Sequence, residues 1–311
     1  MRFSVQLPTE KVEPDHEFLS AAAISEMAQA AETAGFDACF VTDHPMPDDR
    51  FLGSGGHHSL DPFVALAFAA AATTRIRLLT YVLVLPYRNP FIAAKAAASL
   101  DVLSGGRVLL GVATGYLEGE FAALGADFHE RNERTDEAID AIKRAWTEDG
   151  IRLEGRHFKA VGNTMRPRPL QRPHPPIWVG GNSKRAIRRA VERGDGWLPF
   201  PAPRRLARYI RTAPMETVSD LEKGIAYARE HAAAIGRRAP LDISFVPFGL
   251  EMFGEGTLEP EHFLEQVTEL ERIGVTWLAV TLPCTSRKQY CERASAFGEQ
   301  ILSRLPAQDT K

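Results

Sequence analysis

The sequence has few cysteines, little net charge and no long apolar run. Its longest apolar run covers residues 63–72, about half of the roughly 20 residues that a membrane-spanning helix needs. Three cysteines, Cys39, Cys284 and Cys291, have neither the number nor the spacing of a disulfide framework or a zinc knuckle. A formal net charge of -3 gives no general attraction to nucleic acid or to an anionic membrane. We therefore expect a soluble cytoplasmic protein with no nucleic-acid or membrane partner.

The composition is that of an ordinary globular protein, with 44% hydrophobic and 25% charged residues. At the N-terminus, Phe3, Val5 and Leu7 alternate with polar residues, a pattern that favours a first strand over a signal peptide. No composition shift marks a domain boundary. We expect one domain over residues 1–305 and a short tail over residues 306–311.

A unit of helix, glycine and strand recurs along the chain. Residues 31–41 and 269–280 each end an amphipathic helix at a glycine and then enter an apolar strand, and residues 191–200 form a looser third copy. A left-handed residue, usually glycine, commonly ends a helix. The glycines expected in this role are Gly35, Gly274 and Gly194.

Eight apolar segments have the length of strands, and helical patterns separate them. These segments are residues 3–7, 38–41, 76–84, 108–113, 177–179, 196–199, 243–248 and 277–282. Strands that alternate with helices predict a parallel (β/α)8 barrel rather than a doubly wound sheet. Two irregular segments, the proline-rich residues 165–176 and residues 201–216, interrupt the alternation. We expect both at the C-terminal mouth of the barrel, where active sites are built.

The sequence GGNS follows the fifth strand and precedes a helix. On one interpretation it is a tight turn in which Asn182 or Ser183 caps the helix. On the other, Gly180 and Gly181 let a phosphate approach the backbone N–H groups at the helix start. The motif alone leaves both open.

Asp43 and His44 end the second strand. A histidine at a barrel mouth can exchange a proton near neutral pH, but Asp43 can also cap the turn while His44 is a structural residue. The fourth strand ends similarly in Thr114, Gly115 and Tyr116, and the tyrosine either lines a pocket or packs in the wall. The next histidines, in the glycine-rich sequence GSGGHHS, suggest a mobile loop rather than a metal site.

Four segments together resemble the bacterial luciferase-like superfamily of flavin- and deazaflavin-dependent oxidoreductases: residues 41–44, 82–116, 120–146 and 166–199. The resemblance implies a (β/α)8 barrel that binds FMN or the deazaflavin coenzyme F420 at its mouth, with GGNS holding the cofactor phosphate. It also implies a cis peptide bond, not preceding proline, between Thr80 and Tyr81 or one residue later.

The deazaflavin branch is the more similar one. By this resemblance Asp43 lies against the cofactor ring and His44 lies near the carbon that carries the hydride. Thr114 stands where the luciferase subunit has an arginine for the FMN phosphate, which favours F420. Tyr116 stands where the related sugar-phosphate dehydrogenases have an acid/base glutamate, which argues against glucose 6-phosphate oxidation.

The resulting prediction is an F420-dependent oxidoreductase that transfers a hydride to or from a C=C, C=N or C=O bond of a small substrate. His44 is the expected proton partner, and Tyr116 a substrate contact or second proton donor. The expected cofactor-binding residues are Asp43, Thr80, Tyr81, Thr114, Gly115, Gly180, Gly181, Asn182 and Ser183. We expect a homodimer and no metal.

Two alternatives stay open at this point. One is a two-component monooxygenase that takes reduced FMN from a flavin reductase and activates oxygen. The other is a flavin-binding protein with a degenerate site, which would bind its cofactor without turning over a substrate.

Overall fold

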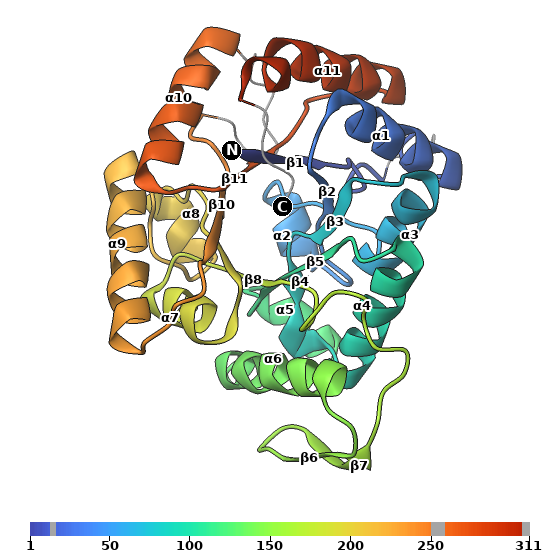
Figure 1. The fold of residues 1–311 in the computed structure, drawn as a ribbon, viewed down its shortest axis with the longest axis vertical. Helices are drawn as coiled ribbons and strands as arrows, with labels where there is room; N and C mark the ends of the chain where they lie inside the picture. Colours follow the sequence, from blue (N-terminus) through green and yellow to red (C-terminus); the bar gives the residue numbers. More distant parts are fainter. Residues whose placement is uncertain (13–16, 250–258, 307–311) are drawn as a thin grey trace.

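In the computed structural model, which describes residues 1–12, 17–249 and 259–306, a closed barrel of eight parallel strands is surrounded by helices (Figure 1). This confirms the predicted (β/α)8 barrel. The strands are β1 (Arg2–Gln6), β2 (Ala38–Val41), β3 (Arg77–Thr80) with β4 (Leu83–Val84), β5 (Val108–Ala113), β8 (Ile177–Gly180), β9 (Gly196–Leu198), β10 (Asp242–Phe245) and β11 (Trp277–Val280). Residues 307–311 of the predicted tail lie outside the described residues.

The third barrel strand is not continuous, in contrast to the expected strand over residues 76–84. It breaks between β3 and β4, where the peptide bond between Tyr81 and Val82 is cis. The second of the two predicted positions is therefore confirmed. Beside the break, Thr80 Oγ1 donates to the Gly111 carbonyl at 2.7 Å. A Cβ on Gly111 would lie 2.1 Å from the Thr80 carbonyl oxygen, so only glycine permits this approach of the two strands.

The long helices pack apolar faces against the barrel. They are α1 (Ala21–Ala34), α3 (Pro62–Ala72), α4 (Pro90–Ser104), α6 (Arg131–Thr147), α7 (Lys184–Arg193), α9 (Val218–Ala234), α10 (Pro260–Ile273) and α11 (Arg287–Gln300). Shorter helical segments are α2 (Asp49–Gly53), α5 (Glu118–Ala123), α8 (Arg204–Tyr209), η1 (Leu85–Tyr87) and η2 (Leu302–Arg304). Among the described residues, no helix combines the length and the apolar character that crossing a membrane requires.

The glycine caps are confirmed at two of three positions. Gly35 and Gly274 end α1 and α10 in the left-handed region, with φ of 96° and 113°. Gly194 has φ of -108°, so its predicted left-handed conformation is wrong. The chain passes directly into β9 there, and a Cβ on Gly194 would lie 2.9 Å from the Ala190 carbonyl oxygen. Glycine is needed at this position for close approach rather than for a left-handed turn.

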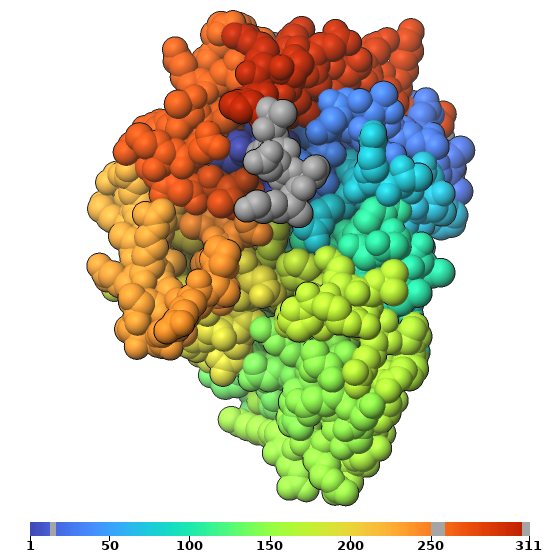
Figure 2. All heavy atoms as spheres, in the orientation of Figure 1, coloured from blue at the N-terminus to red at the C-terminus, as the bar shows by residue number. Residues whose placement is uncertain are grey.

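The chain between α6 and β8 lies at the N-terminal end of the barrel. It opens with a hairpin that the sequence did not predict, β6 (Ile151–Glu154) and β7 (Lys159–Asn163), which projects from the molecule opposite α10 and α11 (Figure 2). Gln171 then donates to the Val108 carbonyl oxygen at 2.8 Å, at the start of β5. The expectation that residues 165–176 lie at the mouth is therefore wrong, because α6 has already returned the chain to the opposite end.

Side chains fill the interior of the barrel, so it is a core rather than a channel. The inward-pointing cluster includes Phe40, Tyr81, Trp178 and Trp277, all buried, with the two indole rings 5.1 Å apart. A ligand of the barrel therefore has to bind at its mouth, where α2, α5 and α8 follow β2, β5 and β9.

Candidate active site

The C-terminal mouth gathers the strand ends that the sequence predicts to be functional. The rings of His44 and Tyr116, which follow β2 and β5, lie 6.1 Å apart. Gly180, at the end of β8, lies beside the cis peptide, since a Cβ there would be 3.5 Å from Val82 Cγ1. Because parallel strands end on one side of a barrel, residues far apart in the sequence form a single region.

Asp43 is buried and held by a bidentate ion pair. Arg88 donates to its two carboxylate oxygens at 2.7 and 2.8 Å, and the Val84 backbone N–H donates at 2.9 Å. Burial raises the pKa of Asp43, and the guanidinium and this N–H oppose the shift. The carboxylate therefore ties β2 to β4. Sequence reasoning did not single out Arg88.

His44 lies against a fully buried glutamate, Glu120 of α5. His44 Nδ1 is 3.3 Å from Glu120 Oε2, and the same oxygen accepts from the Tyr87 hydroxyl at 2.7 Å. The other oxygen accepts from the Met46 backbone N–H at 3.0 Å. Burial acts to raise the pKa of Glu120, but these hydrogen bonds outweigh it and hold the pKa below its ordinary value.

An ionised carboxylate only accepts hydrogen bonds. In neutral His44 the proton therefore lies on Nδ1, facing Glu120, and Nε2 carries the lone pair. A buried carboxylate in this position also stabilises the positive charge that the imidazole acquires when it takes a proton at Nε2. The contact with Glu120 thus leaves Nε2 of His44 as the ring atom that can accept a proton.

Sequence reasoning missed Glu120. The sequence GYLEGEF contains two glutamates, Glu118 and Glu120, and their spacing does not say which one turns inward. In the structure Glu118 is exposed, whereas Glu120 has no exposed surface. The only indication in the sequence was that Glu120 directly precedes an apolar residue, Phe121, which is buried on the same helix.

The segment after β2 covers His44. The His44 backbone N–H donates to Ser59 Oγ at 2.7 Å, and its ring lies 4.8 Å from that of Phe51 and 4.9 Å from that of His57. Burial lowers the pKa of His57 to about 4, so this second imidazole is neutral. The segment GSGGHHS begins at the end of α2, with Gly53, Ser54, Gly55 and His58 exposed and His57 and Ser59 against His44. No three His, Cys, Asp or Glu side chains of the described chain lie together as metal ligands.

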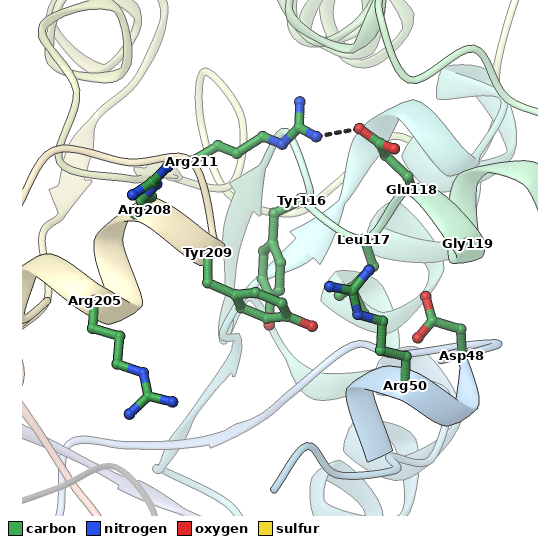
Figure 3. Close-up of a pocket in the computed structure, with 10 residues that line it drawn as sticks. All are labelled: Asp48, Arg50, Tyr116, Leu117, Glu118, Gly119, Arg205, Arg208, Tyr209 and Arg211. Carbon is green, nitrogen blue, oxygen red and sulfur yellow. Dashed lines mark hydrogen bonds and ion pairs between the residues drawn. The ribbon is translucent and has the colours of Figure 1, made fainter. Parts of the chain in front are cut away.

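Tyr116 lines a cavity of about 670 Å³ at the mouth, shown in Figure 3. This favours the pocket-lining alternative over packing in the barrel wall. Burial raises the pKa of Tyr116, so its hydroxyl stays protonated and can donate a hydrogen bond. The next residue toward the strand, Gly115, has φ of 73°, and a Cβ on it would lie 2.7 Å from Val84 Cγ1. Thr114 is half-buried beside it.

The side chains of two predicted cofactor-binding residues do not reach the mouth. The Thr80 hydroxyl is bonded to Gly111 inside the barrel wall. The Tyr81 ring packs 4.7 Å from that of Phe40 in the barrel interior. Beyond Tyr81, the half-buried side chain of Val82 lies beside Gly180 at the end of β8.

In GGNS, the polar side chains are bonded within the protein. Ser183 caps α7 by accepting from the Ala186 N–H at 3.2 Å. Asn182 accepts from the Phe200 N–H at 3.1 Å and donates to the Phe200 and Ala213 carbonyl oxygens at 2.9 and 3.2 Å. The capping interpretation is thus confirmed for Ser183. For a phosphate, the structure leaves the N–H groups at the start of α7 other than that of Ala186.

Two buried hydroxyls near the mouth have no hydrogen-bond partner in the described part of the chain. They belong to Thr9, after β1, and to Thr42, which precedes Asp43. Buried polar atoms are normally satisfied, so each such atom needs an explanation. The polar edge of a flavin or deazaflavin ring, with its carbonyl and N–H groups, fits these hydroxyls.

Comparison with known proteins gives a family match. The family model described as luciferase-like monooxygenase matches residues 1–257. An FMNH2-dependent dimethylsulfone monooxygenase of Pseudomonas putida is 35% identical over 176 residues, which cover 55% of this chain and 46% of that protein. This chain thus spans less than half the length of that relative.

Other relatives match over more of their length. An uncharacterised protein of Mycobacterium tuberculosis is 31% identical over 301 residues, covering 89% of this chain and 92% of that protein. An F420-dependent glucose-6-phosphate dehydrogenase of Amycolatopsis mediterranei is 29% identical over 274 residues, which cover 80% of this chain and 75% of that protein.

Solved structures share the fold. A monooxygenase from Streptomyces bottropensis superposes with a TM-score of 0.75 at 24% identity, covering 97% of this chain and 99% of that one. A coenzyme F420 dependent tetrahydromethanopterin reductase from Methanopyrus kandleri gives a TM-score of 0.72 at 17% identity. The match covers 97% of this chain and 98% of that one.

Proposed function

The chain belongs to the luciferase-like monooxygenase family, and from this premise we propose that it is an F420-dependent oxidoreductase. It transfers a hydride between the coenzyme and a C=C, C=N or C=O bond of a small organic substrate. The observation that carries the proposal is the pairing of His44 with the buried carboxylate of Glu120 at the barrel mouth. Reduction of such a bond by hydride needs a proton as well, and this pair can deliver it.

The mouth offers contacts that fit the coenzyme. The hydroxyl of Thr42, which has no hydrogen-bond partner among the described residues, suits a polar edge of the ring. Gly180 and Gly181 keep the adjacent backbone bare, and the first N–H groups of α7 suit a phosphate. When bound, F420 supplies the carbon that gives or accepts the hydride.

The side chains of this protein handle the proton. His44 Nε2 holds or accepts it, and Glu120 keeps the ring oriented and stabilises its positive form. Phe51 and His57 cover the imidazole on the α2 side and exclude water from it. Tyr116, a protonated phenol 6.1 Å from the His44 ring, donates a hydrogen bond to the substrate. Asp43 positions β2 against β4 through Arg88 rather than taking part in the proton transfer.

Two observations support F420 over FMN. Thr114 provides no charge for an FMN phosphate at the end of β5. The F420-dependent relative matches 80% of this chain, whereas the FMNH2-dependent relative matches 55%. The higher identity of the FMNH2-dependent relative nevertheless favours a second candidate, a monooxygenase that receives reduced FMN from a flavin reductase.

One experiment separates the two. The purified protein is given reduced F420 with a panel of enones, imines and ketones under nitrogen, and separately reduced FMN with the same panel under air. The proposal predicts oxidation of F420 coupled to a reduced product. An oxygenated product in the FMN reaction alone would support the second candidate instead.

We also propose that the protein works in the cytoplasm as a homodimer. Its three cysteines are free thiols, which suits a reducing compartment. Helix α3 exposes Val64 and Phe68, one turn apart, with 58% and 43% of their surfaces accessible. A second copy would cover such a face. Sedimentation equilibrium tests this, since a monomeric mass at micromolar concentration would contradict it.

A further inference from the structure

The cavity beside Tyr116 carries an excess of positive charge. It lies between the segments that follow β2, β5 and β9 (Figure 3). Its charged lining residues are Asp48, Arg50, Glu118, Arg205, Arg208 and Arg211. Four arginines against two carboxylates leave a formal excess of two positive charges, in a chain whose formal net charge is -3. The cavity therefore has the opposite sign to the protein as a whole.

The two carboxylates are already engaged. Glu118 pairs with Arg211 across the cavity. Asp48 caps α2 by accepting from the Phe51 N–H at 2.8 Å. The side chains of the other three arginines, Arg50, Arg205 and Arg208, form no ion pair or hydrogen bond with any residue that the structure describes. Their charges are free for a ligand.

Aromatic side chains stand between these arginines. The rings of Tyr116 and Tyr209 lie 6.5 Å apart, and in Figure 3 Arg50 lies on one side of them and Arg205 on the other. Tyr116 also touches the ring of His44. A ligand in the cavity would thus have an anionic group among arginines and a flat body beside two phenols. His44 does not line the cavity, but it lies directly behind Tyr116, so the end of the ligand at Tyr116 is the end nearest to His44.

We propose that this cavity selects a substrate that carries a carboxylate or phosphate on an aromatic or other flat body, held by Arg205, Arg208 and Arg50. The inference rests on the proposed function, because it takes His44 as the reacting end. None of Gly180 to Ser183 lines the cavity. An anion bound here is therefore separate from a phosphate at the start of α7. F420 also carries carboxylates on its tail, so competition between F420 and the anion distinguishes a substrate site from a cofactor site.

Benzoate and benzamide test the proposal, because they have the same shape and differ in charge. Binding of each to the full-length protein is measured by NMR titration, first without cofactor and then with saturating F420. Benzoate should bind about tenfold more tightly than benzamide. The double substitution Arg205→Gln and Arg208→Gln should abolish this difference.

Arg204→Gln is the matched control, since Arg204 lies on the same helix but pairs with Glu216 outside the cavity. It should leave the preference for benzoate unchanged. Equal binding of benzoate and benzamide to the wild type would overturn the proposal, as would loss of the preference in the control. Displacement of benzoate by F420 would assign the cavity to the cofactor and also overturn it. If F420 fails to bind while the preference persists, the proposed function fails and the anion site stands.

Discussion

Glu120→Gln tests the role of the buried carboxylate behind His44. The substitution keeps the size of the side chain and removes its charge. In the wild type the carboxylate accepts from His44 Nδ1, the Tyr87 hydroxyl and the Met46 N–H. The glutamine amide can still accept a hydrogen bond at its oxygen. Its NH2 group, however, takes the place of a carboxylate oxygen that accepts in the wild type, and so it faces a hydrogen-bond donor. If that group turns to His44, the imidazole proton moves to Nε2 and the base is blocked.

The size of the effect follows from the geometry. Two unit charges 3.3 Å apart attract by about 5 kcal/mol at an effective dielectric constant of about 20. This attraction is an upper limit for the transition-state stabilisation that the variant loses. A hydrogen bond to a charged group typically contributes about 1.5–3 kcal/mol. A loss of about 2.7 kcal/mol from the transition state corresponds to about a 100-fold fall in kcat.

Steady-state kinetics and a binding titration measure the effect. We expect kcat to fall about 100-fold while the affinity for the cofactor changes by less than about threefold. Glu137→Gln is the control, because Glu137 of α6 lies 2.8 Å from His157 in a similar pair, which joins α6 to the segment between β6 and β7. It should leave kcat unchanged. Unchanged kcat in Glu120→Gln, or an equal fall in both variants, would show that Glu120 does not support the proton transfer at His44.

Four further predictions concern the same region. His44→Ala should lower kcat about 100-fold with cofactor affinity retained, and normal turnover would remove His44 from the mechanism. Asp43→Asn should lower the free energy of unfolding by about 3 kcal/mol in urea, because it leaves Arg88 without its buried partner; a loss under 1 kcal/mol would mean that the pair behaves like a surface contact. Ser183→Ala should lower that free energy by about 1 kcal/mol without weakening F420 binding, since the N–H groups remain; weaker binding would make the hydroxyl a ligand. Because the folded protein holds the pKa of Glu120 below its ordinary 4.5, this carboxylate stabilises the fold above that pH, and the stability is lost as pH falls through the lowered pKa. Thermal melts at pH 7 and pH 4 should show a larger loss for the wild type than for Glu120→Gln, and equal losses would contradict this.

Local patterns were enough to predict the barrel. The eight strands follow from short apolar segments between helical patterns, and the caps at Gly35 and Gly274 follow from glycines at helix ends. The structure confirms these because each depends on neighbours in the sequence. Gly194 shows the limit, since its role depends on the approach of backbone atoms that periodicity does not describe.

The site was predictable only in part, because its key contacts join distant segments. The ends of β2, β5 and β8 could be expected to meet at the mouth, which is where His44, Tyr116 and GGNS lie. The partner of His44 could not, since 76 residues separate it from Glu120. The same holds for Asp43, whose partner Arg88 lies 45 residues further on.

We propose that the mouth of this barrel binds a deazaflavin and uses it for hydride transfer. Fluorescence titration of the purified protein with F420 and, separately, with FMN at equal protein concentration tests it most directly. We predict micromolar or tighter binding of F420 and much weaker binding of FMN. A preference for FMN would contradict it and would turn the search toward oxygenated products and a partner reductase.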